Sequence, residues 1–196
     1  MLLNILRIKL LLQPAGYNNN GEIRIYDNNF NLLRTLPGHQ YETDGLAFTP
    51  DGKYLISGGD DGLVKFWDYN TGVLIRTLTH GTYLNGGTNV NVDVSPDGQF
   101  VASAGSGYNM TTKIWRVSDG QLIKTLHIDG DYGYNTVKFT PDGKYAASGL
   151  IQYGLGGLGY YGRILFWTVP DGVLAKEYVD KQGSPTSGGI RTLDFS

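Results

Sequence analysis

The 196-residue sequence contains no cysteine, few charged side chains and no long apolar stretch. Without cysteine the chain can form neither disulfides nor thiolate metal sites; this does not decide the compartment, although we favour the cytoplasm. Charged residues make up 17% of the chain and the formal net charge is −2, so no overall positive field attracts nucleic acid. The opening residues MLLNILRIKLLL are too few to span a bilayer, and Arg7 and Lys9 make them a poor signal peptide. We therefore expect neither a nucleic-acid partner nor a membrane segment.

Glycine and tyrosine, in contrast, are abundant, with 29 and 14 residues. This combination is typical of a chain with many turns between short strands. The hydrophobic fraction of 40% is ordinary for a folded protein, which argues against disorder. The length is that of one domain and is sufficient to bury a core.

Residues 45–78 form the clearest unit of the sequence. Four short runs there are rich in β-branched and aromatic residues and are too short for helices: 46–48, 53–57, 63–67 and 73–78. Tight-turn sequences separate them, Thr-Pro-Asp-Gly at 49–52 and Tyr-Asn-Thr-Gly at 69–72. The pattern predicts an antiparallel meander of four strands. One such sheet cannot bury two apolar faces alone, so we expect it to stack on others.

The same unit recurs along the chain. The turn prolines Pro50, Pro96 and Pro141 are 46 and then 45 residues apart. The fourth run, 74–78, has copies at 32–36 and 122–126. The aromatic residue that ends the third run recurs as Tyr26, Trp67, Trp115 and Trp167. A period in the forties with four strands per repeat is typical of a β-propeller.

Gly38-His39, Trp67-Asp68 and the Pro-Asp-Gly turns make this unit resemble the WD-repeat β-propeller family over nearly all of residues 17–196. The resemblance implies an all-β fold, a β-propeller of four-stranded antiparallel blades. The chain would supply three complete blades plus two partial ones, which together amount to about four blades. We expect a single domain over 1–196 whose blades cover, in order, 1–37 (partial), 44–79, 89–127, 135–179 and 189–196 (partial).

The resemblance also implies a buried hydrogen-bonded set, because in that family a histidine, a serine or threonine, an aspartate and the tryptophan pair with one another. The matching residues are His39, Ser57, Asp61 and Trp67. The second repeat keeps Ser103 and Trp115, but it carries His80 in reversed order with its glycine and lacks the aspartate. The third keeps only Ser148 and Trp167. We therefore expect the full set in one blade, and packing alone to hold the others.

Both ends of the chain fall inside a repeat. Residues 1–12 are predicted to form a second strand, which places Asn20 where Asp61 falls in the clearest unit, and 192–196 match a first strand. Three explanations remain. In the first, the chain closes on itself into a four-bladed ring, with 190–195 paired to the N-terminal strand. In the second, two chains form an eight-bladed ring, a homodimer. In the third, which we favour, the sequence is a piece of a longer propeller. Pairing the ends would remove an exposed sheet edge.

The long insertions are expected to lie on one face of the propeller: 81–88, 105–111, 128–135, 150–162 and the inter-blade connection 181–189. They hold Tyr83, Tyr108, Tyr132, Tyr134, Tyr153, Tyr160 and Tyr161. Tyrosine, glycine and asparagine are typical of adaptable binding loops. We predict that this face binds a protein or peptide partner; the alternative is that the loops only pack on one another.

No set of residues predicts catalysis. The glycine-rich segment 154–159 lacks the Lys-Ser/Thr pair and the helix of a phosphate-binding loop. His39, His80 and His127 occupy equivalent places on different blades, so they cannot converge on one metal ion. No serine lies in a nucleophile elbow. We expect a non-catalytic interaction scaffold with no cofactor, metal or catalytic residue. The alternatives are an accessory or sensor propeller domain of a larger enzyme or signalling protein, or a module that binds a glycan or small molecule.

Overall fold

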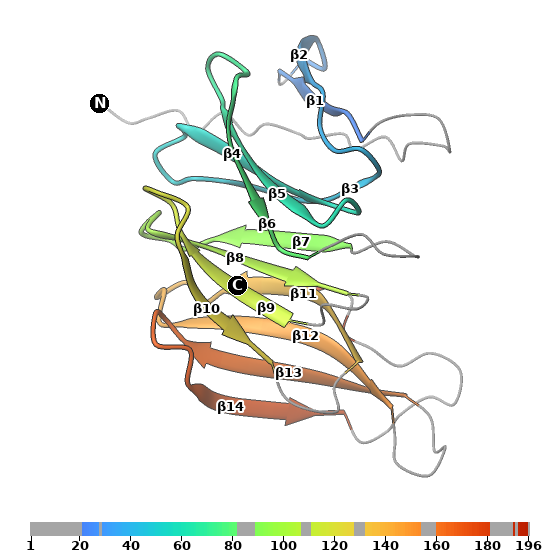
Figure 1. Ribbon diagram of the computed structural model, residues 1–196, viewed down its shortest axis with the longest axis vertical. Coiled ribbons are helices and arrows are strands. Elements are labelled where there is room, and N and C mark those ends of the chain that lie inside the picture. The colour runs from blue at the N-terminus through green and yellow to red at the C-terminus, as the bar shows by residue number, and fades with distance from the viewer. Residues whose placement is uncertain are drawn as a thin grey trace.

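The computed structural model describes residues 21–27, 29–81, 89–106, 111–127, 132–153, 160–180, 190 and 192–195. Within these residues the chain is all-β, without a helix, and its strands form four antiparallel sheets. The sheets follow one another in chain order and are stacked face to face from sheet 1 to sheet 4 (Figure 1). The predicted four-stranded antiparallel meanders are confirmed.

Sheet 1 contains β1 (Ile23–Tyr26) and β2 (Leu32–Leu36). Sheet 2 contains β3 (Thr43–Phe48), β4 (Tyr54–Gly59), β5 (Leu63–Asp68) and β6 (Leu74–Thr79). Sheet 3 contains β7 (Val90–Val94), β8 (Phe100–Gly105), β9 (Thr111–Arg116) and β10 (Leu122–Leu126). Sheet 4 contains β11 (Tyr132–Phe139), β12 (Tyr145–Tyr153), β13 (Tyr160–Thr168) and β14 (Leu174–Val179).

The tight turns between first and second strands are built by their own side chains. Thr49 Oγ1 donates to Asp51 Oδ1 at 2.6 Å, and the same carboxylate accepts the backbone N–H of Lys53 at 3.0 Å. Gly52 follows with φ of 69°, a left-handed conformation that glycine adopts without strain. Sheets 3 and 4 repeat this arrangement with Ser95 and Thr140. The Pro-Asp-Gly signal in the sequence therefore fixes where each hairpin reverses.

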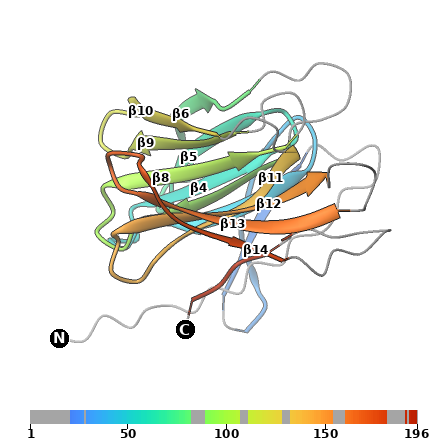
Figure 2. The ribbon, with the colours of Figure 1, turned by 90° about the horizontal axis from the view of Figure 1, so that it is seen from below.

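Apolar side chains fill each interface between consecutive sheets. The strands β3, β7 and β11 are the first of their sheets and lie next to one another, while β6, β10 and β14 form the outer edges (Figure 2). Ile25 of sheet 1 packs with Trp67 of sheet 2, and Phe66 of sheet 2 packs with Trp115 of sheet 3. Trp167 packs in the same way in the cluster between sheets 3 and 4. The aromatic residue that recurs in the sequence thus packs back on the preceding sheet.

Basic side chains on the outer strands tie each sheet to the next. Arg34 on β2 donates to the backbone carbonyls of Tyr69 and Asn70, the latter at 2.7 Å. Arg76 on β6 donates to the carbonyls of Val117 at 2.9 Å and Ser118 at 3.3 Å. These carbonyls belong to the turn between third and fourth strands of the following sheet. At the next interface the aliphatic carbons of Lys124 lie beside the equivalent turn at 170–172.

The end of the chain differs from the expectation of a first strand. Residues 192–195 form no strand, although the segment lies on the outward face of sheet 4. Ile190 packs over Gly149 and Gly162, and the Phe195 ring centroid is 6.3 Å from that of Phe166. A first strand requires a second strand beside it to complete its hydrogen bonds, and no described residue of the chain provides one there. The predicted strand at 1–12 and Asn20 lie outside the described residues.

Candidate binding face and buried hydrogen-bond set

Sheet 2 holds four side chains in one continuous set of hydrogen bonds. Trp67 Nε1 donates to Ser57 Oγ at 2.9 Å, and Ser57 Oγ is 2.8 Å from His39 Nε2. His39 Nδ1 is 2.7 Å from Asp61 Oδ1. Asp61 also accepts the backbone N–H of Gln40 at 3.0 Å, so the set fixes the connection that enters the sheet. Each polar atom in it has a partner, as burial requires.

The directions of these bonds follow from the chemistry of their atoms. A carboxylate only accepts, so His39 Nδ1 carries a proton and donates to Asp61. When that is the only proton on the ring, Nε2 accepts from the Ser57 hydroxyl. The order serine, histidine, aspartate is that of a nucleophilic triad. Here, however, Ser57 is fully buried and its oxygen already accepts the indole N–H of Trp67. No substrate carbonyl reaches that oxygen, so the arrangement supports structure.

Charge near Asp61 stabilises its ionised form. Burial opposes ionisation, but the hydrogen bonds from His39 and from the Gln40 N–H outweigh it, and the pKa of Asp61 lies below its usual value. Lys65 Nζ is 3.8 Å from Asp61 Oδ2 and donates to the Gly38 carbonyl at 2.6 Å. The Leu63 N–H also donates to Asp61 Oδ1 at 3.2 Å, so four neighbours stabilise the anion.

Sheet 3 also has such a set, which corrects the expectation that packing alone holds it. His80 Nδ1 is 2.7 Å from Ser103 Oγ, and Trp115 Nε1 donates to the same oxygen at 2.7 Å. His80 Nε2 lies 3.4 Å from Thr111 Oγ1 in place of an aspartate. The reversed order of His80 and Gly81 does not prevent pairing, because the imidazole reaches the serine through its other nitrogen.

Sheet 4 keeps the serine and the tryptophan but not their bonds to each other. Ser148 Oγ is 2.7 Å from Thr112 Oγ1, a hydroxyl on β9 of the preceding sheet. Trp167 Nε1 is buried and has no hydrogen-bond partner among the residues that the structure describes. Leu150 and Leu165 are fully buried in the cluster between sheets 3 and 4. Apolar packing therefore holds sheet 4, as expected, together with a hydrogen bond between the Ser148 and Thr112 hydroxyl groups across the interface.

Glycines at one position explain which sheets admit a histidine. A Cβ on Gly59 would lie 2.5 Å from the His39 ring, and a Cβ on Gly105 would lie 2.3 Å from His80 Nε2. Such contacts are too close, so only glycine leaves room for the imidazole. The equivalent residue of sheet 4 is Leu150. The sequences Ser-Gly-Gly and Ser-Ala-Gly, against Ser-Gly-Leu, are the signal by which the second set could have been predicted.

Two carboxyl groups meet at the interface between sheets 2 and 3. Asp44 accepts from Asn89 Nδ2 and from the Val90 N–H, both at 3.2 Å. Burial, reinforced by the charge of Asp60, raises the pKa of Asp44 to about 7. Burial also raises the pKa of Asp60, which shares a side-chain hydrogen bond with Asp44 and whose Oδ1 is buried without a partner among the described residues.

The candidate binding tyrosines are mostly on strands, which corrects their assignment to loops. Tyr132 lies on β11, Tyr153 on β12, and Tyr160 and Tyr161 on β13. Tyr134 also lies on β11, while Tyr83 and Tyr108 lie outside the described residues. In the register of sheet 4, Tyr153 pairs with Tyr160 and Tyr132 pairs with Ile151. Five of the seven tyrosines therefore belong to one extended part of sheet 4.

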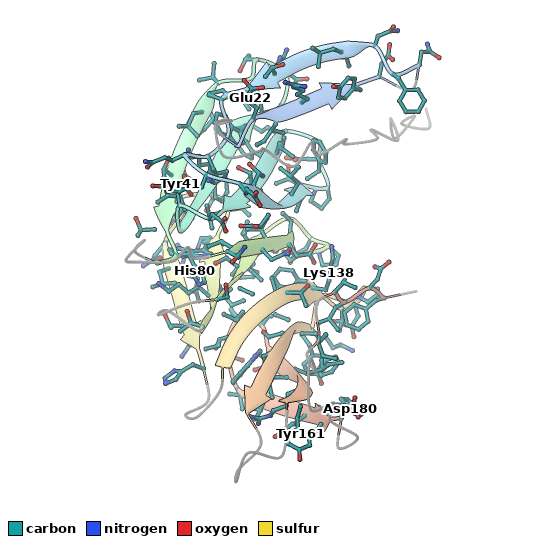
Figure 3. All side chains as sticks on the ribbon, turned by 90° about the vertical axis from the view of Figure 1, so that its right-hand side faces the viewer. Glu22, Tyr41, His80, Lys138, Tyr161 and Asp180 are labelled. Carbon is teal, nitrogen blue, oxygen red and sulfur yellow. The ribbon has the colours of Figure 1, made fainter. Side chains whose placement is uncertain are left out.

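An ion pair and a backbone hydrogen bond hold β13 against β14 next to this extended part of sheet 4. The strands β12 and β13 each have nine residues, against six in β4 and β5. Arg163 on β13 is buried and pairs with Glu177 Oε1 on β14, at 3.0 Å from Nε and 2.9 Å from Nη2. The Asp180 N–H donates to the Gly162 carbonyl at 2.8 Å. Figure 3 shows Tyr161 and Asp180 close to each other at the end of the stack formed by sheet 4. We call residues 132–134, 151–153 and 160–162 the sheet 4 extension.

Two further features concern ions and membranes. In the part of the chain that the structure describes, no three histidine, aspartate or glutamate side chains are arranged to hold a metal ion. Among the same residues there is no helix with the length and apolarity needed to cross a membrane.

Comparison with known proteins supports the fold first. A chain of hydrazine synthase from Kuenenia stuttgartiensis matches with a TM-score of 0.67 at 19% identity, over 82% of this chain and 43% of that one. At this identity the likeness shows the fold alone. The four-stranded sheets are blades of the β-propeller class.

The sequence comparisons then give the family. The model of the WD domain, G-beta repeat, matches residues 30–68 and 72–116. Nuclear distribution protein PAC1 of Arthroderma otae is 31% identical over 53% of this chain and 23% of its own length. WD repeat-containing protein 36 of Homo sapiens is 36% identical over 37% of this chain and 8% of its own. Apoptotic protease-activating factor 1 of Rattus norvegicus is 33% identical over 50% of this chain and 8% of its own.

Residues 30–68 and 72–116 thus match WD repeats, and the family resemblance noted in the sequence is confirmed. Proteins of this family generally act as scaffolds that bind other proteins. The chain spans less than a quarter of the length of each of these three relatives.

Proposed function

We propose that this protein is a non-catalytic interaction scaffold and that its sheet 4 extension binds a protein or peptide partner. One observation carries the proposal: β12 and β13 are longer than the corresponding strands of sheets 2 and 3, and the extended part of sheet 4 contains five of the candidate tyrosines, on β11, β12 and β13. Tyrosine supplies a large amphipathic surface at a small cost in side-chain entropy.

The base of the extension suits this role. The Arg163–Glu177 pair and the Asp180 backbone bond hold β13 against β14 just below the extension. A binding surface on paired strands keeps its geometry better than one on a free loop, so less entropy is lost on association.

The test replaces Tyr160 and Tyr161 together with serine. Peptides selected for binding from a random display library on the original chain provide the probe. We expect the double variant to bind them at least about tenfold more weakly, because burial of two aromatic rings is lost. Its thermal midpoint should remain close to that of the original chain.

A matched control is Ile75→Ser, which removes an exposed apolar side chain from the outer strand of sheet 2, away from the extension. It should leave peptide binding unchanged. Equal affinity of the tyrosine double variant would move the binding face elsewhere. Unfolding of that variant would mean that these tyrosines serve packing.

A second candidate role follows from the lengths of the relatives. Because the matched repeats make up a small share of those proteins, this chain can act as an accessory or sensor propeller beside other domains, or bind a glycan or small molecule. Turnover of a peptide or sugar library by the purified chain would favour a role in an enzyme over the scaffold.

A further inference from the structure

Asp44 occupies an irregular position in the inner strand of sheet 2. The register between β3 and β4 shifts by one residue between Thr43 and Gly45, so Asp44 is the extra residue of a β-bulge. A bulge changes the direction of a side chain, and bulges are frequent beside functional sites. Here the Asp44 carboxyl group makes a hydrogen bond with that of Asp60, which lies in the connection between β4 and β5.

A hydrogen bond between two carboxyl groups requires a proton on one of them, because an ionised carboxylate only accepts. Asp60 Oδ1 is buried and has no donor among the described residues. Asp44 accepts from Asn89 Nδ2 and from the Val90 N–H of sheet 3, both at 3.2 Å. The pair therefore carries one proton and one negative charge, and the donors of sheet 3 stabilise that charge.

The charged groups around the pair oppose a second negative charge. Burial raises the pKa of Asp60, and the negative charges of Glu42 and Asp61 raise it further. His39 has the opposite effect, but its Nδ1 is bound to Asp61, and Lys65 Nζ also lies beside Asp61 at 3.8 Å. The described residues of sheet 3 that contact the pair bring uncharged donors. The surroundings thus favour one negative charge over two.

Sheet 3 makes the equivalent contact with neutral groups. Ser106 stands where Asp60 stands in sheet 2, and its hydroxyl donates to Asn89 Oδ1 at 3.2 Å. The register between β7 and β8 runs to this end without a shift, and Val90 pairs with Gly105. A neutral contact is therefore sufficient to close this end of a sheet. The carboxyl pair of sheet 2 adds a dependence on pH that the fold itself does not require.

We propose that Asp44 and Asp60 share one proton and form a pH-sensitive switch, which holds the connection between β4 and β5 against β3. When the proton is lost, the two carboxylates repel each other. Asp44 keeps its two donors on sheet 3, so the partly exposed Asp60 turns to solvent and loosens its connection. This connection and the sheet 4 extension both join second to third strands, so they lie at the same end of their sheets. The switch does not depend on what the extension binds.

Nuclear magnetic resonance of the aspartate carboxyl carbons tests whether the proton is shared. We expect the Asp44 resonance to titrate near pH 7 and the Asp60 resonance to respond at the same midpoint, because one proton serves both groups. An Asp60 resonance that does not change near that midpoint would overturn the proposal. So would titration of Asp44 at its ordinary value.

The variant Asp60→Asn separates sharing from burial. Its amide can donate to Asp44 at every pH and carries no charge, so the Asp44 midpoint should fall by at least about one pH unit. Glu42→Gln is the matched control, because it removes a nearby charge from an exposed side chain. It should move the Asp44 midpoint by less than about 0.3 unit. An unchanged midpoint in Asp60→Asn would overturn the proposal, since burial alone would then hold the proton.

Amide hydrogen exchange of the original chain tests the release of the connection and needs no variant. The Gly62 N–H donates to the Gly59 carbonyl at 3.0 Å within the connection. Its protection factor, which corrects for the intrinsic effect of pH on exchange, should fall at least about threefold between about pH 5.5 and about pH 8.5. The Gly52 N–H, bound to the Thr49 carbonyl at 2.8 Å at the opposite end of sheet 2, should keep its protection. Equal protection of Gly62 at both pH values would overturn the switch.

Discussion

Sheets 2 and 4 occupy equivalent positions in the repeat but bury different chemistry beside their tryptophans. In sheet 2 the space next to Ser57 holds His39, which bonds Asp61, and Gly59 leaves room for the ring. In sheet 4 Leu150 stands in place of Gly59, and no histidine enters. The comparison teaches that the repeat tolerates either a fully paired polar set or an apolar filling.

The interfaces on either side of sheet 3 differ in a related way. Asp44 of sheet 2 meets sheet 3 beside another carboxyl group, Asp60. Asp93 of sheet 3 meets sheet 4 beside a cation: it accepts from Lys138 Nζ and from the Phe139 N–H, both at 2.8 Å. One interface therefore carries a carboxyl group that is costly to ionise, and the other carries a matched ion pair.

The largest expected effect comes from His39→Ala. It removes the partner of both Ser57 and Asp61 and leaves a cavity, so we expect a loss of about 3–4 kcal/mol in the free energy of unfolding. Urea denaturation followed by tryptophan fluorescence measures it. His127→Ala, at the equivalent but exposed position before sheet 4, is the control and should change stability by less than about 0.5 kcal/mol. Equal losses in both variants would contradict the distinction between the two sheets.

Thr112→Val tests the hydroxyl pair that joins sheets 3 and 4. The variant leaves the buried Ser148 hydroxyl without its partner, and we expect a loss of about 1–2 kcal/mol in urea denaturation. Adding Ser148→Ala should recover most of that loss, since neither side then has an unpaired polar group. A double variant less stable than Thr112→Val would contradict the pairing.

Replacing tryptophan with phenylalanine should distinguish the two sheets by about 1 kcal/mol. Trp67→Phe loses the bond to Ser57, whereas Trp167→Phe removes a buried N–H for which no described residue is a partner. Both variants lose the same volume, so the difference in their unfolding free energies isolates the hydrogen bond. A larger loss for Trp167→Phe would show that its indole nitrogen has a partner in solution.

A further prediction concerns pH and the carboxyl group of Asp44. Its pKa in the folded chain, about 7, lies above the ordinary value, so the folded state binds the extra proton. The resulting stability is fully present below the ordinary pKa of 3.8 and is lost as pH rises through about 7. Between about pH 5 and pH 8 the chain should lose on the order of 2–3 kcal/mol through this group, and Asp44→Asn should flatten the profile. Asp93→Asn, which breaks an ion pair, should instead lower stability without flattening it.

Much of the fold could be predicted because its signals are local. Pro-Asp-Gly turns and the aromatic residue at the end of each third strand fix the hairpins without reference to distant residues. The set around His39 followed from the family pattern. The pair between Thr112 and Ser148 could not be predicted in this way, because it joins two repeats and replaces a residue type that the pattern expects.

The sheet 4 extension was missed for a different reason. Residues 150–162 are rich in glycine and do not alternate in polarity, so the sequence favours a loop. Pairing between β12 and β13 nevertheless continues to Tyr153 and Tyr160. Strand pairing that begins in a well-packed sheet can extend into such a segment because the register is already set. The missing strand at 192–195 shows the converse, since a suitable sequence without a neighbour forms no ladder.

The hydrogen bonds of the outer-strand arginines run in one direction along the stack, from each sheet to the one that follows it in the sequence. Arg34 and Arg76 each reach forward in the sequence, and no equivalent contact reaches backward from the same turns among the described residues. Losing one sheet therefore deprives its predecessor of hydrogen-bond acceptors but takes only donors from its successor. Under mechanical load or in denaturant, we expect the order in which sheets detach to depend on the end from which detachment begins.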